Sequence, residues 1–99
     1  MIEKFETAGG TVRVSGELDA EDDTLLREAL EAALAERPEK LVVDLSAVER
    51  IHSRPIAILC YAWVEALKNQ IEMEVVASAG VERVFRSANL DQVFTLRGP

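Results

Sequence analysis

The sequence predicts an α/β domain in which helices alternate with the strands of a largely parallel sheet. Two observations carry this prediction: short apolar runs of strand length recur along the chain, and amphipathic segments of helical period lie between them. The resulting order is β-β-α-β-α-β-α-β, with the opening hairpin as the exception to the parallel arrangement. A chain of 99 residues provides one hydrophobic core, so residues 1–99 are expected to form a single domain.

The predicted strands are short and bounded by turn residues. The first two, Ile2 to Thr7 and Thr11 to Ser15, form a hairpin around a pair of glycines, and the second alternates apolar with polar residues. Leu41 to Leu45 is a nearly continuous apolar run, which is typical of a central strand covered on at least one face. Glu74 to Ser78 and Val93 to Leu96 complete the predicted sheet.

Three helices are predicted between these strands. The first begins at Asp22 or Asp23, where an acidic side chain can cap the helix and complement its dipole, and it ends before Pro38. The second runs from about Pro55 to Asn69, and the third from Val81 to Ala88. Apolar residues of the first helix recur at spacings of three and four, which predicts one buried face: Leu26, Ala29, Leu30, Ala33 and Leu34.

The net charge of the chain limits the classes of partner that the protein is expected to bind. Eleven Lys and Arg stand against eighteen Asp and Glu, which gives a formal net charge of −7. Binding to nucleic acid or to anionic lipid requires a basic surface, so neither is expected. A basic protein partner remains compatible with this charge.

Other classes are excluded by what the sequence lacks. One cysteine cannot form an internal disulfide, and one Cys with one His leaves a zinc site dependent on carboxylates, so neither a metal nor another cofactor is expected. The first ten residues lack the pattern of a signal peptide, and the longest apolar run, residues 55–64, is too short to cross a bilayer. We therefore expect a cytoplasmic protein.

The second predicted helix carries more apolar side chains than one buried face requires. On a helical wheel the predicted core stripe comprises Ile56, Leu59, Cys60, Trp63 and Leu67. Ile58 and Tyr61 lie on the other side, beside the loop that precedes the helix. Two interpretations stay open: a neighbouring helix or terminus covers them, or they form a patch that binds a partner, since aromatic side chains are enriched at interface centres.

Several segments in this order resemble a known family. Gly16-Glu17-Leu18-Asp19 follows a strand, an Ile-x-Ser loop opens the second helix, and Val81-Glu82-Arg83-Val84-Phe85 precedes Asn89-Leu90. From about Phe5 to Leu96, the chain resembles a STAS domain and is similar to the bacterial anti-sigma factor antagonists. The resemblance implies a small mixed sheet of four to five strands, with three to four helices packed largely on one side.

The resemblance also implies a function. Members of this type are non-enzymatic regulators that bind a kinase which otherwise holds a sigma factor, and this exchange is called partner switching. The kinase phosphorylates the second serine of an Asp-Ser-Ser-Gly motif at the start of the second helix, which breaks the complex. The matching stretch here is His52-Ser53-Arg54-Pro55, so Arg54 replaces the phosphoacceptor. Arginine cannot accept a phosphate, so this switch is either absent or moved to Ser53.

The implied contact surface lies around this loop and the acidic residues before the first helix. Asp19 matches a partner-facing position of the family, or else it helps to cap the helix. Glu21 extends this acidic edge, although a solvated helix start explains Glu21, Asp22 and Asp23 more simply. The candidate partner-binding residues are Asp19, Glu21, His52, Ser53, Arg54, Ile58 and Tyr61.

Each residue of the loop also has a simpler interpretation. Ser53 is a candidate phosphorylation site or a helix cap, and His52 is a plain loop residue or a pH-sensitive surface group. Arg54 contacts an acidic partner or a nucleotide phosphate, or it is merely solvated. Because His52 and Ser53 are adjacent and lack a third member of a triad, no catalytic residues are expected. Asp44, at the end of its strand, is interpreted as a loop organiser.

A second function keeps the same fold. Some STAS proteins are subunits of transporter complexes, including lipid-transport ATPases, in which the domain stabilises the ATPase and phosphorylation is not required. Replacement of the acceptor serine by Arg54 agrees with this alternative, in which Ile58 and Tyr61 contact the ATPase. The gene neighbourhood, a sigma-factor operon or a transporter operon, distinguishes the two.

Overall fold

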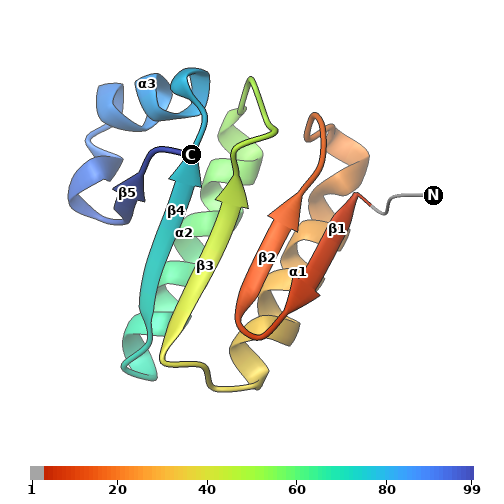
Figure 1. The fold of residues 1–99 in the computed structure, drawn as a ribbon, viewed down its shortest axis with the longest axis vertical. Coiled ribbons are helices and arrows are strands. Elements are labelled where there is room, and N and C mark those ends of the chain that lie inside the picture. Colours follow the sequence, from red (N-terminus) through yellow and green to blue (C-terminus); the bar gives the residue numbers. More distant parts are fainter. Residues whose placement is uncertain (1–3) are drawn as a thin grey trace.

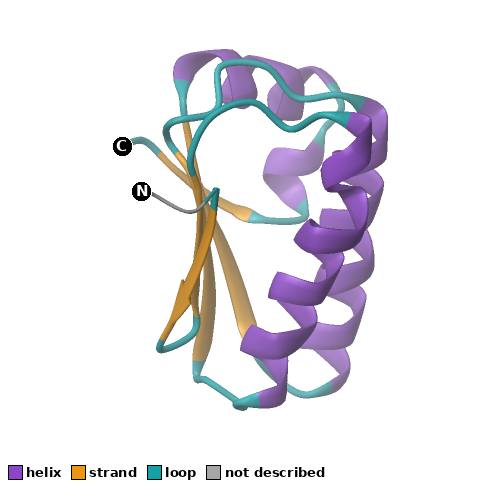
Figure 2. Ribbon diagram, turned by 90° about the vertical axis from the view of Figure 1, so that its right-hand side faces the viewer, coloured by secondary structure: helices purple, strands orange, loops and turns teal. Residues whose placement is uncertain are grey.

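The sheet has five strands and carries its helices on one face (Figures 1 and 2). The computed structural model describes residues 4–99. The strands lie in the order β1-β2-β3-β4-β5, of which β1 and β2 pair antiparallel and all other neighbours pair parallel. The elements are β1 (Phe5–Ala8), β2 (Thr11–Val14), α1 (Asp23–Ala35), β3 (Lys40–Leu45), α2 (Ser53–Lys68), β4 (Glu72–Ala77), α3 (Ala79–Ser87) and β5 (Thr95–Arg97). The predicted fold class and element order are confirmed.

The core lies between the sheet and the two long helices. Alternate residues of β3, namely Leu41, Val43 and Leu45, are fully buried beneath the helices, as the period of a strand requires. The predicted stripe of α1 supplies the opposite side, with Leu26 and Leu30 buried. Figure 2 shows α1 and α2 side by side over this face, whereas no described helix covers the other face.

Ion pairs join neighbouring strands on the open face of the sheet. Glu74 of β4 lies 3.8 Å from Lys40 of β3 and 3.2 Å from Arg97 of β5. Arg13 of β2 lies 3.4 Å from Asp44 of β3. The helix-free face therefore carries these charged pairs beside Val42 and Val76, which alternate with the core residues of β3 and β4.

Element boundaries differ from the prediction where polar side chains take special roles. Ser78 does not extend β4, because its hydroxyl oxygen accepts a hydrogen bond from the Val81 N–H at 3.3 Å and caps α3. The last strand begins at Thr95, because a 3₁₀ turn (Leu90–Gln92) occupies the preceding residues. Asn89 adopts the expected left-handed conformation, with φ of 60°. The predicted residue Ile2 lies outside the described residues.

The predicted core stripe of α2 is wrong in part. Leu67 is 61% exposed, and Cys60 and Trp63 are only half-buried. The buried side chains of α2 are instead Pro55, Leu59, Ala62 and Ala66. This face is buried because its small side chains allow close packing against α1 and the sheet. The helical-wheel prediction missed it because it followed the large apolar side chains.

Two further classes of feature are absent from residues 4–99. None of the helices described there has the length and apolar character needed to cross a membrane. The same residues contain no group of three or more His, Cys, Asp or Glu side chains suited to holding a metal ion.

Candidate functional site

The loops that precede α1 and α2 meet at one end of the molecule. The strands β2 and β3 are parallel neighbours, so the loops that follow them emerge at the same edge of the sheet (Figure 1). The Glu49 N–H donates a hydrogen bond to Glu17 Oε1 at 3.3 Å, which joins the two loops. The Ser78 hydroxyl donates to the carbonyl of Val48 and ties in the loop after β4. These contacts fix the relative positions of the three loops.

A buried carboxylate organises the acidic edge before α1. Asp22 Oδ2 accepts a hydrogen bond from Lys4 Nζ and another from the Asp19 N–H, each at 2.7 Å. Burial opposes ionisation of Asp22, but these hydrogen bonds outweigh burial and hold its pKa below the usual value. The hydrogen bond with Asp22 raises the pKa of Lys4. The solvated interpretation is therefore wrong for Asp22, whereas Asp19 and Glu21 are exposed at the same edge.

Asp22 also does not cap α1 through its side chain. It occupies the N-cap position of the helix, but its carboxylate is directed to Lys4 and to the backbone of the preceding 3₁₀ turn (Ala20–Asp22). The sequence signal for a cap was an acidic residue at the helix start. Lys4, 18 residues earlier in the chain, competes for that carboxylate, and only the folded arrangement brings the two together.

The start of α2 presents exposed polar residues. His52 occupies the N-cap position with an extended backbone, and its side chain forms no capping hydrogen bond. Ser53 is already the first helical residue, so the interpretation of Ser53 as the cap is wrong. Both side chains are exposed, which leaves the Ser53 hydroxyl at the surface beside Arg54.

Arg54 joins the starts of the two long helices. Its Nε lies 2.8 Å from Asp23 Oδ2, and the arginine side chain is 74% exposed whereas that of Asp23 is 16% exposed. Asp23 Oδ2 is buried and accepts no hydrogen bond, so the contact is an ion pair without hydrogen-bonding geometry. Arg54 is therefore mostly exposed to solvent, as its simpler interpretation expects, but it also forms an ion pair with Asp23. Asp23, assigned only to the acidic helix start, is the partner that sequence reasoning missed.

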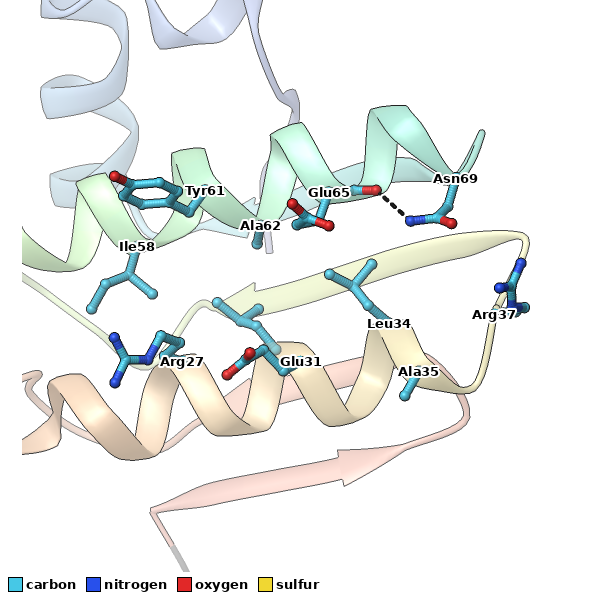
Figure 3. A pocket seen from close by; sticks show the side chains of 11 residues that line it. Arg27, Glu31, Leu34, Ala35, Arg37, Ile58, Tyr61, Ala62, Glu65 and Asn69 are labelled. Atoms are coloured by element: carbon cyan, nitrogen blue, oxygen red, sulfur yellow. Dashed lines mark hydrogen bonds between the residues drawn. The ribbon is translucent and has the colours of Figure 1, made fainter.

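A groove follows the seam between α1 and α2 (Figure 3), and a smaller part that shares Arg27 and Ile58 with it adjoins the ion pair. Its main part has a volume of about 690 Å³, and a smaller part of about 320 Å³ reaches Asp23 and Arg54. Ile58 is half-buried and points from α2 toward α1, whereas Tyr61 stands at the rim and is 77% exposed. No described helix or terminus covers Tyr61, so the covered interpretation is wrong for this residue.

The comparison with known families decides what kind of domain carries this surface. Residues 3–98 match a family described as "Mlab, STAS domain". The chain belongs to the STAS domain family. The match spans the sheet and all three helices, so the resemblance carried by the sequence segments is confirmed.

Relatives of this STAS domain include regulatory proteins. It is 36% identical over 84 residues to "Anti-sigma-F factor antagonist RsfB" of Mycobacterium tuberculosis. The aligned region covers 84% of this chain and 68% of the relative. A solved anti-sigma factor antagonist from Mycobacterium paratuberculosis is 30% identical, with a TM-score of 0.74 over 93% of this chain and 80% of that one. A putative anti-sigma factor antagonist from Thermotoga maritima shares the fold, with a TM-score of 0.79, 21% identity and coverage of 96% and 84%.

Asp44 organises the loop that leads to α2 in this STAS domain. Its Oδ1 accepts hydrogen bonds from the Ser46 N–H at 3.0 Å and the Ser46 hydroxyl at 2.6 Å. Burial opposes ionisation of Asp44, but these bonds and the charge of Arg13 prevail, and the pKa of Asp44 is lowered. The interpretation of Asp44 as a loop organiser is confirmed.

Proposed function

We propose that this STAS domain is an anti-sigma factor antagonist that binds a kinase-type anti-sigma factor in a partner-switching system. The observation that carries the proposal is the 36% identity to the mycobacterial anti-sigma-F factor antagonist over most of this chain. In this role the domain acts in the cytoplasm as a binding module without catalytic residues or cofactors. Its effect on transcription arises because the bound anti-sigma factor no longer holds its sigma factor.

The proposed contact surface joins the loop end of the sheet to the groove. It comprises the exposed residues Asp19, Glu21, His52, Ser53, Arg54 and Tyr61, together with the half-buried Ile58. The surface has acidic and basic sides with an apolar centre, because Arg54 lies between the acidic edge and Ile58. Exposed charges surrounding a buried apolar centre are the usual arrangement of a protein–protein interface.

Arg54 supports a binding function that does not depend on the family's phosphorylation site. It occupies the position of the phosphoacceptor and contributes an ion pair with Asp23, so this position cannot carry a phosphate. The exposed Ser53 is the remaining candidate. A phosphate on Ser53 would lie at the N-terminus of α2 beside Arg54, where the helix dipole and the guanidinium stabilise negative charge.

Mass spectrometry after incubation with the cognate kinase and ATP tests this point. We expect no phosphate in the wild-type chain at residue 54, and a phosphate on Ser53 would show that the switch has moved. Ser53→Ala is the matched control, because it removes the hydroxyl and leaves Arg54 and its ion pair with Asp23 in place. A phosphate on any residue outside this loop would contradict the assignment of the loop as the switch.

Binding to the host's kinase-type anti-sigma factor tests the function itself. We expect the two purified proteins to form a complex in titration calorimetry and to co-purify from the native host. Absence of a complex, with and without nucleotide, would refute the proposal. Co-purification with a transporter ATPase instead would favour the alternative function, which the antagonist relatives do not support.

A further inference from the structure

The groove between α1 and α2 combines an apolar floor with charges that lack partners. Leu30, Leu34, Ile58 and Ala62 supply apolar surface, and Figure 3 shows Leu34 and Ile58 pointing across the groove from opposite helices. The charges that line the groove on the side of α1 follow in the order Arg27, Glu31, Arg37. Among residues 4–99, none of these three takes part in an ion pair.

We propose that this groove binds one amphipathic helix of the partner protein, which lies antiparallel to α1 and α2. The helix bears an acidic residue at its N-terminal end, a basic residue near its middle and its negative dipole end toward Arg27. The identity of the partner as an anti-sigma factor rests on the proposed function. The groove and its charge order are features of the structure and do not depend on that assignment.

The shape of the groove favours a helix over a small ligand. Ligand pockets bury most of the surface of a small molecule, whereas this groove is open along its length between two helices. From Ile58 to Asn69 it follows about three turns of α2, roughly 16 Å. Three turns of a partner helix supply apolar residues at spacings of three, four and seven, which is the pattern that grooves of this kind recognise. Tyr61, exposed at the rim, then packs against the side of that helix.

The direction of the helix follows from electrostatics. Because β2, β3 and β4 are parallel neighbours and each long helix connects two of them, α1 and α2 point the same way. Their positive ends lie beside Arg27, whereas the charge of Arg54 is balanced by its ion pair with Asp23, so a third helix packs favourably with its negative C-terminal end beside Arg27. Its N-terminal end, where acidic residues are favoured, then lies beside Arg37. Glu31 and Glu65 lie midway and match a basic residue of the partner helix.

The backbone at Arg37 offers a way to remove its side chain without adding strain. Arg37 follows α1 with φ of 52°, in the left-handed conformation that glycine adopts at lower cost. Gln70 follows α2 in the same conformation, with φ of 60°, but does not line the groove. Arg37→Gly therefore removes a groove charge while it relieves backbone strain, and Gln70→Gly relieves the same strain without changing the groove.

The binding experiment measures the affinity of the full chain for the host's purified kinase-type anti-sigma factor. We expect Ile58→Asp to weaken binding at least about tenfold, because it places a carboxylate in an apolar contact. We expect Arg37→Gly to weaken it about threefold to fivefold while raising Tm, whereas Gln70→Gly raises Tm and leaves affinity unchanged. If Ile58→Asp does not fold, Tyr61→Ala replaces it as the groove variant, because Tyr61 is exposed.

Photo-crosslinking tests the direction of the helix. Benzoylphenylalanine replaces Ala57 at one end of the groove and Ala35 at the other, and the crosslinked residues of the anti-sigma factor are mapped by mass spectrometry. We expect both crosslinks within one helix, roughly eight residues apart, with the Ala35 contact nearer its N-terminus. The reverse order, or crosslinks to a segment that is not helical, would overturn the proposal.

The remaining outcomes separate this inference from the proposed function. If the wild-type chain binds the anti-sigma factor but the groove variants bind equally well, the groove proposal is wrong and the proposed function stands. If the wild-type chain does not bind, both are refuted. A wild-type dimer that Ile58→Asp converts to a monomer, seen by light scattering, would assign the groove to a second copy and also overturn the proposal.

Discussion

Replacing Lys4 by Met tests how the fold holds the acidic edge of the proposed contact surface. Lys4 Nζ lies 2.7 Å from Asp22 Oδ2, and the two side chains are 31% and 11% exposed. Met keeps the apolar length of lysine but removes the ammonium, so Asp22 loses its counterion and retains only the hydrogen bond from the Asp19 N–H. The buried carboxylate then bears a desolvation cost that Lys4 had offset.

The expected loss of stability is modest. A hydrogen bond to a charged group contributes about 1.5–3 kcal/mol, and the partial exposure of Lys4 places this one at the low end, about 1.5 kcal/mol. For a domain of this size, that loss lowers Tm by about 6–12 °C. The measurement is urea and thermal denaturation of both proteins at neutral pH. Lys68→Met is the matched control, because Lys68 and Glu65 form an exposed pair at 3.5 Å whose loss costs less than about 0.5 kcal/mol.

The pH dependence identifies the cause. The pKa of Asp22 is lowered in the folded state, so its stabilising contribution is present above the unfolded value of about 3.9 and is lost as pH falls through the folded value. The pKa of Lys4 is raised, so its contribution is lost only as pH rises above about 10. The stability difference between wild type and Lys4→Met should be constant near neutral pH and shrink below about pH 4. A difference under 0.5 kcal/mol, or one unchanged at pH 3, would refute this reasoning.

Two further substitutions test other contacts. Arg54→Ser removes the ion pair with the half-buried Asp23 and should cost about 1 kcal/mol in urea denaturation, while mass spectrometry should find the introduced serine phosphorylated by the cognate kinase. An unphosphorylated introduced serine would contradict the proposed kinase-binding surface. Leu67→Lys should change stability by less than about 0.5 kcal/mol because Leu67 is exposed, whereas Ala66→Leu should cost about 1–3 kcal/mol by overpacking the core. Equal losses from these two would contradict the observed orientation of α2.

The order of elements and the buried face of α1 followed from local patterns. Spacings of three and four predicted that Leu26 and Leu30 lie on the buried face of α1, and both are buried. Every second residue of β3 is buried beneath the helices, because side chains alternate between the two faces of a strand. These features depend on the period of one element, which neighbouring residues in the chain already contain. The left-handed residue Asn89 belongs to the same class, because its conformation is a local property of the helix end.

Tertiary structure decided the orientation of α2 and the contacts of the loop end. Packing against α1 determines which face of α2 is buried. The helical-wheel prediction gave more weight to the large apolar side chains than to the small residues Ala62 and Ala66, which are buried. The pairs Lys4–Asp22 and Arg54–Asp23 join residues that are distant in the chain, so no local pattern predicts them. Local patterns were sufficient to predict the sheet, its helices and the family motif around Arg54. Only the packed structure determined which charges are paired, and which are left unpaired along the groove.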